Sequence, residues 1–179
     1  MLELEIKVLE IDRPMVESLL GDCGAEKIFD GEILDFKYDN VNRDVKNSSK
    51  SIRLRRKGDL TYLTIKEKIF TNCVRARTEF EIQIPSFEDA ERYLSDHGLF
   101  SLDLRRKHRT SYILDGILYE FDKLNGEFDF VPEYLEIEGP SVASIYMAAL
   151  GLGFMKDDER ISNLSVGGLI RKYRDEIAA

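Results

Sequence analysis

Residues 2–8 read LELEIKV, and an apolar side chain alternates with a charged one at every step of this stretch. Successive side chains of a β-strand point to opposite faces, so one face of this predicted strand is apolar and the other is charged. The charged face carries Glu3, Glu5 and Lys7. A polar face made wholly of ionic groups is unusual for a strand, and the same feature recurs along the chain.

Seven later segments alternate in the same way. Their charged faces contain Asp35, Lys37 and Asp39; Arg53, Arg55 and Lys57; Lys66 and Lys68; Arg75, Arg77, Glu79 and Glu81; Lys107 and Arg109; Glu120 and Asp122; and Glu136 and Glu138. Short connections such as Gly58-Asp59 and Asp115-Gly116 are typical of antiparallel hairpins. We therefore predict about eight short antiparallel strands.

Helices are predicted over residues 14–23, 86–97, 142–152 and 164–178, where apolar residues follow helical spacing. Asp12 and Ser86 are suited to cap the first two, and Gly98 is suited to end the second. Strands interrupted by helices indicate an α+β fold. A chain of 179 residues is short enough for one domain, which we place at residues 1–179.

Composition excludes several classes of protein. The 26 Lys and Arg against 34 Asp and Glu give a net charge of −8, which argues against binding to nucleic acid or anionic membranes through overall charge. The most apolar run, residues 145–155, is too short to span a bilayer, and the N-terminus lacks the apolar stretch of a signal peptide. Cys23 and Cys73 have no metal-binding spacing. We expect a cytoplasmic protein without nucleic-acid or membrane partners.

The charge is unevenly distributed, since residues 43–77 carry eleven Lys and Arg but three Asp and Glu. An RNA-binding face would need aromatic side chains among these cations, and only Tyr62 is suitably placed. An open sheet would turn the charged faces to water, yet like charges two residues apart, such as Arg53 and Arg55, repel there. A closed eight-stranded antiparallel β-barrel, with its helices outside, would gather all the charges in one wet lumen.

Such a lumen suits a highly charged ligand. Carboxylate pairs are the ligands preferred by Mg²⁺ or Mn²⁺, whereas Arg and Lys bind the oxygens of a phosphate chain. Charges of both signs on one face therefore suit a complex of a metal ion with a polyphosphate.

The stretch LELEIKV also resembles the ExExK signature of the CYTH family, the class IV adenylyl cyclases and thiamine triphosphatases, which are also called triphosphate tunnel metalloenzymes. Further elements resemble those of the family in the expected order. They are SIRLR at residues 51–55, TIK at 64–66, RTEFE at 77–81, KHR at 107–109, FDKLNGEF at 121–128 and LEIE at 135–138. The resemblance spans nearly the whole chain and implies an eight-stranded tunnel that binds a triphosphate with Mg²⁺ or Mn²⁺.

Carried over by position, the resemblance implies three sets of site residues. Contacts to the triphosphate would come from Lys7, Arg53, Arg55, Lys66, Arg77 and Arg109. The metal ions would be held by Glu3, Glu5, Glu81, Asp122, Glu136 and Glu138. The catalytic set would be Glu3, Glu5, Lys7, Lys66 and Asp122.

A hydrolase and a cyclase would both use the same contacts to the triphosphate. Hydrolysis requires less additional recognition than cyclisation, so we favour a triphosphatase acting on ATP, thiamine triphosphate or tripolyphosphate. The alternative is a class IV adenylyl cyclase that converts ATP to cyclic AMP and pyrophosphate. A non-catalytic polyphosphate- or nucleotide-binding module is a third interpretation. A homodimer is compatible with the sequence, but no feature of the sequence demonstrates one.

The remaining polar residues receive simpler interpretations. Glu79 and Glu120 share the inward parity and are expected to bind metal or to pair with Arg77 or Lys107. The tunnel rim is assigned Lys57, Lys68 and Arg75, and surfaces outside the lumen are assigned Arg56, His97 and His108. Residues 40–51 are expected to form an exposed loop, with a lid over one tunnel mouth as the alternative. The C-terminal helix would close the other opening.

Overall fold

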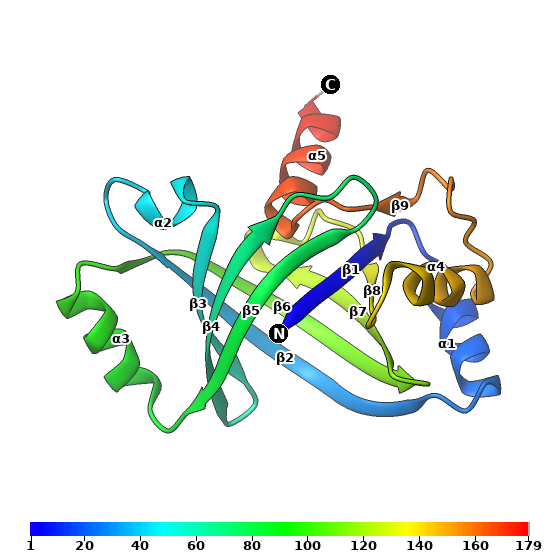
Figure 1. Cartoon of the computed structure of the whole chain (residues 1–179), viewed down its shortest axis with the longest axis horizontal. Helices are drawn as coiled ribbons and strands as arrows, with labels where there is room; N and C mark the ends of the chain where they lie inside the picture. Colours follow the sequence, from blue (N-terminus) through cyan, green and yellow to red (C-terminus); the bar gives the residue numbers. More distant parts are fainter. Residues whose placement is uncertain (179) are drawn as a thin grey trace.

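Eight antiparallel strands close into a barrel in the computed structural model, which describes residues 1–178 (Figure 1). The strands are β1 (Leu2–Val8), β2 (Glu26–Asp39), β3 (Lys50–Lys57), β4 (Leu60–Ile69), β5 (Arg75–Ile84), β6 (Phe100–Leu114), β7 (Ile117–Asn125) and β8 (Tyr134–Glu138). Their order is β5-β4-β3-β2-β6-β7-β8-β1, and pairing of β1 with β5 closes the barrel. The predicted α+β barrel is confirmed.

Five α-helices lie outside the barrel: α1 (Arg13–Asp22), α2 (Asp44–Asn47), α3 (Phe87–Asp96), α4 (Val142–Gly151) and α5 (Val166–Ala178). A short 3₁₀ turn, η1 (Gly126–Phe128), follows β7, and a two-residue strand, β9 (Ile161–Ser162), adds to β1. Helices α1 and α4 lie together on one side of the barrel, α3 lies on the opposite side, and α5 stands at one end (Figure 1). The predicted caps form, since Asp12 and Ser86 accept hydrogen bonds from backbone N–H groups of α1 and α3.

The main hydrophobic core lies on the outside of the barrel wall, beneath α1 and α4. Ile6 of β1 and Ile137 of β8 pack there with Val16 of α1 and Ile145 of α4, and all four are fully buried. Each such side chain contributes about 1.5–3 kcal/mol on burial. Because the apolar faces of the strands turn outward to this core, period-two alternation turns the charged faces into the lumen.

Two strands are longer than the alternation predicted. β2 begins at Glu26 and β6 at Phe100, and they pair with each other over most of their lengths. Irregular register between Lys27 and Phe29, and again between Lys37 and Tyr38, interrupts the period-two signal. The extension matters for the site because it pairs residues 101–105 of β6 with the same part of β2 that pairs with residues 52–55 of β3 on its other side.

The segment of residues 40–51, predicted as a loop, contains the short helix α2. Asp39 organises it, because its buried carboxylate accepts hydrogen bonds from the backbone N–H groups of Asn40, Val45 and Lys46. The segment lines the cavity of the barrel with Arg43, Val45, Lys46 and Ser49. Among residues 1–178, no helix is long and apolar enough to cross a membrane.

Candidate active site

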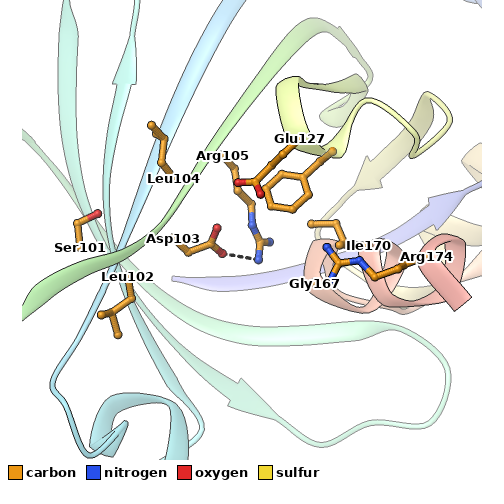
Figure 2. Close-up of a pocket in the computed structure, with 10 residues that line it drawn as sticks. Ser101, Leu102, Asp103, Leu104, Arg105, Glu127, Gly167, Ile170 and Arg174 are labelled. Atoms are coloured by element: carbon orange, nitrogen blue, oxygen red, sulfur yellow. Dashed lines mark ion pairs between the residues drawn. The ribbon is translucent and has the colours of Figure 1, made fainter.

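A cavity of about 1350 Å³ occupies the barrel and is lined by fifteen Lys and Arg and ten Asp and Glu side chains. Ten of the twelve predicted site residues line it: Glu3, Glu5, Arg53, Arg55, Lys66, Arg77, Glu81, Arg109, Glu136 and Glu138. Lys7 and Asp122 are fully buried behind the lining. A smaller cavity of about 540 Å³ adjoins the first between β6 and α5 and shares Arg105 with it (Figure 2). The net charge of the main cavity is thus positive in a protein that is acidic overall.

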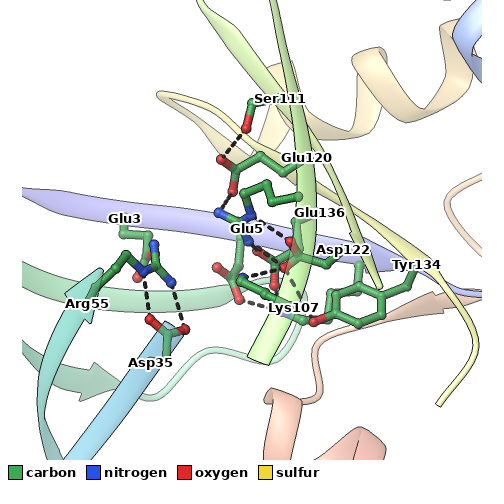
Figure 3. Close-up of polar contacts among 12 residues, drawn as sticks. Glu3, Glu5, Asp35, Arg55, Lys107, Ser111, Glu120, Asp122, Tyr134 and Glu136 are labelled. Atoms are coloured by element: carbon green, nitrogen blue, oxygen red, sulfur yellow. Dashed lines mark hydrogen bonds and ion pairs between the residues drawn. The ribbon is translucent and has the colours of Figure 1, made fainter. Parts of the chain in front are cut away.

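Arg109 stands at the centre of a closed set of ion pairs with Glu120, Asp122 and Glu136, three acids that lie close together (Figure 3). Its Nε and Nη2 donate to the two carboxylate oxygens of Asp122 at 2.6 and 2.5 Å, and Nη2 also lies 2.7 Å from Oε2 of Glu136. Nη1 donates to Glu120, whose other oxygen accepts from Ser111. Lys107 adds a 2.6 Å ion pair to Asp122. Every one of these charges therefore has a partner.

Lys7 links this set to β1. Its Nζ lies 2.7 Å from Oε1 of Glu5 and 2.8 Å from Oε1 of Glu136. Burial opposes ionisation of Glu136, but Lys7 and Arg109 outweigh it and hold the pKa of that carboxyl well below its usual range. Arg75, predicted at the rim, instead lies inside and contacts Glu5 at 2.5 Å. The inward turn of Arg75 follows from pairing of β5 with β1, which places Arg75 directly opposite Glu5.

The carboxylates at the other end of this group are incompletely paired. Glu3 accepts from Lys66 at 2.5 Å through Oε1, but Oε2 is buried without a hydrogen-bond partner among residues 1–178. Glu138 lies opposite Glu5 in the β1–β8 ladder. Burial and the neighbouring charges of Glu3 and Glu120 raise the pKa of Glu138 to about 8. This region of β1 and β8 carries an excess of negative charge.

These carboxylates fit a divalent cation chemically. Hard cations take carboxylate oxygens as ligands, and an unpaired buried oxygen beside a carboxyl held neutral by its neighbours is a site that a cation would stabilise. Glu3, Glu5 and Glu138 are the residues that would hold it. Within the described part of the chain, no three Asp, Glu, His or Cys side chains are already gathered as a coordination shell, so binding would require side-chain movement away from present partners such as Lys66.

The opposite wall, formed by β2, β3 and β6, carries an excess of positive charge. Asp35 receives Nε and Nη2 of Arg55 at 2.7 and 2.9 Å and lies 3.6 Å from Nε of Arg53 (Figure 3). Burial opposes ionisation of Asp35, but Arg53 and Arg55 hold its pKa well below the usual range. Burial and nearby Arg105 lower the pKa of Lys37 to about 8. Asp35 is therefore the shared counter-ion of Arg53 and Arg55.

Other predicted residues have identifiable positions. Glu81 accepts from Thr64 at 2.7 Å and lies 3.5 Å from Arg53, and Arg77 faces Glu3 across the β1–β5 pair. The suggested pairings of Glu79 and Glu120 are wrong, because Glu79 pairs with Lys66 and Glu120 with Arg109. As expected, Arg56 and His108 lie outside the lumen, where they contact Glu88 and the acids Asp30 and Glu32.

The predicted site omits further charged residues that line the cavity, among them Asp35, Lys37, Arg105 and Lys107. The alternation had already placed Asp35, Lys37 and Lys107 on the inward faces, so parity alone could have included them. Arg105 continues the inward series of Lys107 and Arg109 by two residues. Its signal was overlooked because β6 was predicted to begin later than it does.

The fold and the site together define the class: a closed antiparallel β-barrel whose lumen is lined by many charged side chains. The chain belongs to the CYTH family, since the CYTH domain model matches residues 1–144. The assignment made from the ExExK-like stretch and the elements that follow it is confirmed.

Individual relatives agree over almost the whole chain. A Methanocaldococcus jannaschii protein named "putative adenylate cyclase" is 25% identical over 172 residues, which is 96% of this chain and 95% of that protein. A "putative adenylate cyclase" structure from Vibrio parahaemolyticus has a TM-score of 0.78 at 15% identity and covers 94% of this chain and 97% of its own. A "putative adenylyl cyclase" from Hippeastrum, described as having a dominant triphosphatase activity, has a TM-score of 0.63 at 16% identity, covering 96% and 95%. The two structures share the fold.

Proposed function

We propose that this protein is a triphosphatase that depends on a divalent cation, Mg²⁺ or Mn²⁺, and hydrolyses a triphosphate inside the tunnel. The observation that supports this most directly is the separation of unbalanced charge across one cavity. On β1, Oε2 of Glu3 is buried without a hydrogen-bond partner among residues 1–178, and it lies near Glu138 of β8, whose pKa is raised. Crowded cations lie on β2, β3 and β6. A polyphosphate with its metal ion has the complementary charge at each wall.

The phosphate chain would contact the basic residues that already face the cavity. These are Arg53, Arg55, Lys66 and Arg77, whereas Arg109 would reach a phosphate only by exchanging one of its present partners Glu120, Asp122 and Glu136. Guanidinium groups donate paired N–H groups to phosphate oxygens, and they remain charged at any physiological pH. These contacts would hold the phosphate chain so that its terminal phosphorus faces water in line with the leaving oxygen. The surrounding cations would stabilise the negative charge of the transition state.

The metal-binding set would be Glu3, Glu5 and Glu138, with Glu81 and Glu136 nearby. A bound divalent cation would neutralise charge on the phosphate oxygens during transfer. Lys7 and Asp122 lie behind the lining, so we assign them to positioning: Lys7 orients Glu5 and Glu136, and Asp122 orients Arg109 and Lys107.

Adenylyl cyclase is the second candidate, and the name of the M. jannaschii relative is the observation that favours it. Cyclisation would use the same phosphate contacts but would bring the ribose 3′-oxygen of ATP to the α-phosphorus. The physiological substrate of the hydrolase could be ATP, thiamine triphosphate or tripolyphosphate, because all three share the group that the tunnel would bind.

Product analysis tests the proposal. The protein is incubated separately with ATP, thiamine triphosphate and tripolyphosphate, each with Mg²⁺, Mn²⁺ or EDTA, and all products are resolved by ion-exchange chromatography. Orthophosphate that forms only with a cation is the expected result. Cyclic AMP with pyrophosphate would establish the cyclase instead, and absence of any product with either metal would leave a binding module.

Two adjacent arginines of β3 provide a matched pair for the same assay. Arg55 faces the cavity and binds Asp35, whereas Arg56 faces outward and binds Glu88. We expect Arg55→Ala to lower turnover by about 100-fold or more, because it removes fixed positive charge from the transition state. Arg56→Ala should leave turnover within about 2-fold of wild type, since its surface ion pair is remote from the cavity. Equal effects would exclude a phosphate contact by Arg55.

A further inference from the structure

Arg105 of β6 is the least satisfied cation in the barrel wall. Its side chain is only 12% exposed, and its one ion pair joins Nη2 to Oδ2 of Asp103 at 2.5 Å. Among residues 1–178, neither Nε nor Nη1 has a hydrogen-bond partner, and both atoms are buried. A guanidinium carries five N–H donors, and buried donors in native proteins are almost always paired. The N–H groups at Nε and Nη1 of Arg105 therefore remain available to an acceptor from outside the described residues.

The surroundings of Arg105 leave room for that acceptor. Its guanidinium borders the cavity of about 540 Å³ between β6 and α5, to which Arg174 of α5 also contributes (Figure 2). The ring of Phe128 packs beside it, with the guanidinium carbon 5.9 Å from the ring centroid. The acidic residues that line this cavity are Asp103, already paired with Arg105, and the exposed Glu127. An incoming anion would meet two arginines.

This cavity is continuous with the tunnel through shared lining residues. Asp103, Arg105 and Gly167 line both. Between Arg105 and the predicted phosphate contacts lies Lys37, which is opposite Arg53 of β3 on one side and Asp103 of β6 on the other. Nε of Arg53 is also buried without a hydrogen-bond partner in the described chain. Arg53, Lys37 and Arg105 thus lie close together, with Asp35 and Asp103 between them, and both arginines keep buried nitrogens without a hydrogen bond among residues 1–178. We call these three cations the basic track.

We propose that the basic track is a second anion subsite, which binds a phosphate group beyond the three held in the tunnel and extends the substrate class to linear polyphosphates of four or more phosphates. This inference rests on the proposed function, because it takes the tunnel to hold a phosphate chain. Each added phosphate adds an anionic group at a regular interval, which matches a row of cations better than it matches a neutral organic group. The crowding of Lys37 by Arg105, which lowers the lysine pKa, is relieved when an anion lies between them.

Isothermal titration calorimetry tests the subsite. EDTA is present in the titration because removing divalent cations prevents the proposed metal-dependent hydrolysis, so that the measurement reports binding alone. Tripolyphosphate, tetrapolyphosphate and ATP are titrated into wild type, Arg105→Gln and Arg106→Gln. Arg106 is the matched control, because it is the next residue of β6 and is exposed on the outer face. Both variants lose one positive charge, so their general attraction for anions falls equally. Any difference between them reports local contact.

Tetrapolyphosphate should bind wild type and Arg106→Gln about 10-fold more tightly than tripolyphosphate does, because a charge-assisted hydrogen bond is gained. In Arg105→Gln this advantage should disappear, with tripolyphosphate affinity within about 2-fold of the control. Lys37→Gln is the second variant if Arg105→Gln does not fold, and it should show the same selective loss. If the variant that folds, Arg105→Gln or Lys37→Gln, still binds tetrapolyphosphate about 10-fold more tightly than tripolyphosphate, the proposed subsite is wrong.

Two further outcomes separate the possible failures. If wild type binds neither tripolyphosphate nor tetrapolyphosphate in EDTA, the subsite is wrong, whereas the proposed function fails only if the product assay with Mg²⁺ or Mn²⁺ yields no orthophosphate. If Arg105→Gln weakens ATP but not tetrapolyphosphate, the cavity beside Phe128 holds the nucleoside, and the proposal of a fourth phosphate is wrong although the tunnel function stands.

Discussion

The ion-pair set around Arg109 and the basic track contain the same kinds of side chain in the same barrel, yet they differ in how their charges are balanced. Arg109 is shared by Glu120, Asp122 and Glu136, and each of these acids is buried. In the basic track, Arg53 and Arg105 each keep a buried nitrogen without a hydrogen bond in the described chain. Balanced buried charges hold the barrel together, whereas unbalanced ones are suited to receive a ligand.

The carboxylate region of β1 and β8 has the opposite charge imbalance from the basic track, since its unbalanced groups are acidic. There the unpaired atom is Oε2 of Glu3, and the perturbed group is the carboxyl of Glu138. A molecule that fills both regions must carry cationic and anionic parts, which a metal–polyphosphate complex does. The comparison therefore assigns separate tasks to residues that look alike in the sequence, and it can be tested one residue at a time.

Removal of Arg109 should have the largest effect. Arg109→Ala leaves Asp122 and Glu136 buried with fewer counter-charges, and breaking a buried ion pair in this way costs about 3–5 kcal/mol. Arg53→Ala, the matched change in the basic track, should cost less than about 1 kcal/mol because the ion pairs of Arg53 with Asp35 and Glu81 are long, at 3.6 and 3.5 Å, and Arg55 repels it. Urea unfolding at pH 7 measures both free energies. Similar losses would mean that the two regions do not differ as proposed.

The pH dependence of Glu138 should be smaller than the effect at Arg109. Its pKa of about 8 in the fold lies above the ordinary value of 4.5, so the folded state keeps a proton that the unfolded state has released. The resulting stability is complete below the ordinary pKa and is lost as the pH rises through about 8. In EDTA we expect the free energy of unfolding to fall by about 1–2 kcal/mol between about pH 5 and pH 8 from this group.

Glu138→Gln provides the control for that prediction. The amide cannot ionise, so this part of the pH dependence should be absent in the variant. Adding Mn²⁺ at pH 8 should restore stability to wild type but not to Glu138→Gln, because a cation would replace the proton on the carboxylate. Parallel pH profiles for the two proteins would show that Glu138 ionises normally and would remove the argument for a cation beside it.

Much of this architecture could be predicted from the sequence because the alternation is so regular. Once LELEIKV is interpreted as a strand with one charged face, the parity of each later segment assigns the inward residues, and the structure places nearly all of them on the cavity. Parity is a local property, so it says which face a residue occupies. It does not say how deep the residue lies, and the burial of Lys7 and Asp122 behind the lining could not be predicted.

The sequence also did not predict which charged side chains pair with each other. Both the Arg75–Glu5 pair and the Lys66–Glu3 pair join strands that are far apart in the chain. Arg75 and Glu5 lie on β5 and β1, the two strands whose pairing closes the barrel, and Lys66 lies on β4, one strand further away from Glu3. Their formation depends on the stagger between strands, which a single sequence does not encode in any local pattern. Arg105 was missed for a related reason, since the start of β6 is defined by its pairing with the irregular strand β2.

Substitution of Lys37 should change stability least among these predictions, and it measures most directly whether the basic track carries excess positive charge. Its pKa of about 8 lies below the ordinary 10.5, so at pH 7 the fold holds a charge that destabilises it, and stability rises with pH between those two values. Lys37→Met removes that charge, and we expect its Tm at pH 7 to exceed that of wild type by about 2–4 °C. The difference should shrink by about pH 9.5, where wild-type Lys37 is neutral in the fold. Tetrapolyphosphate should reverse the order at pH 7, because its additional phosphate stabilises the charged lysine and gains less from methionine. A lower Tm for Lys37→Met without ligand would mean that Lys37 is balanced by Asp35 and Asp103, and the basic track would then be a structural ion-pair network like the one around Arg109.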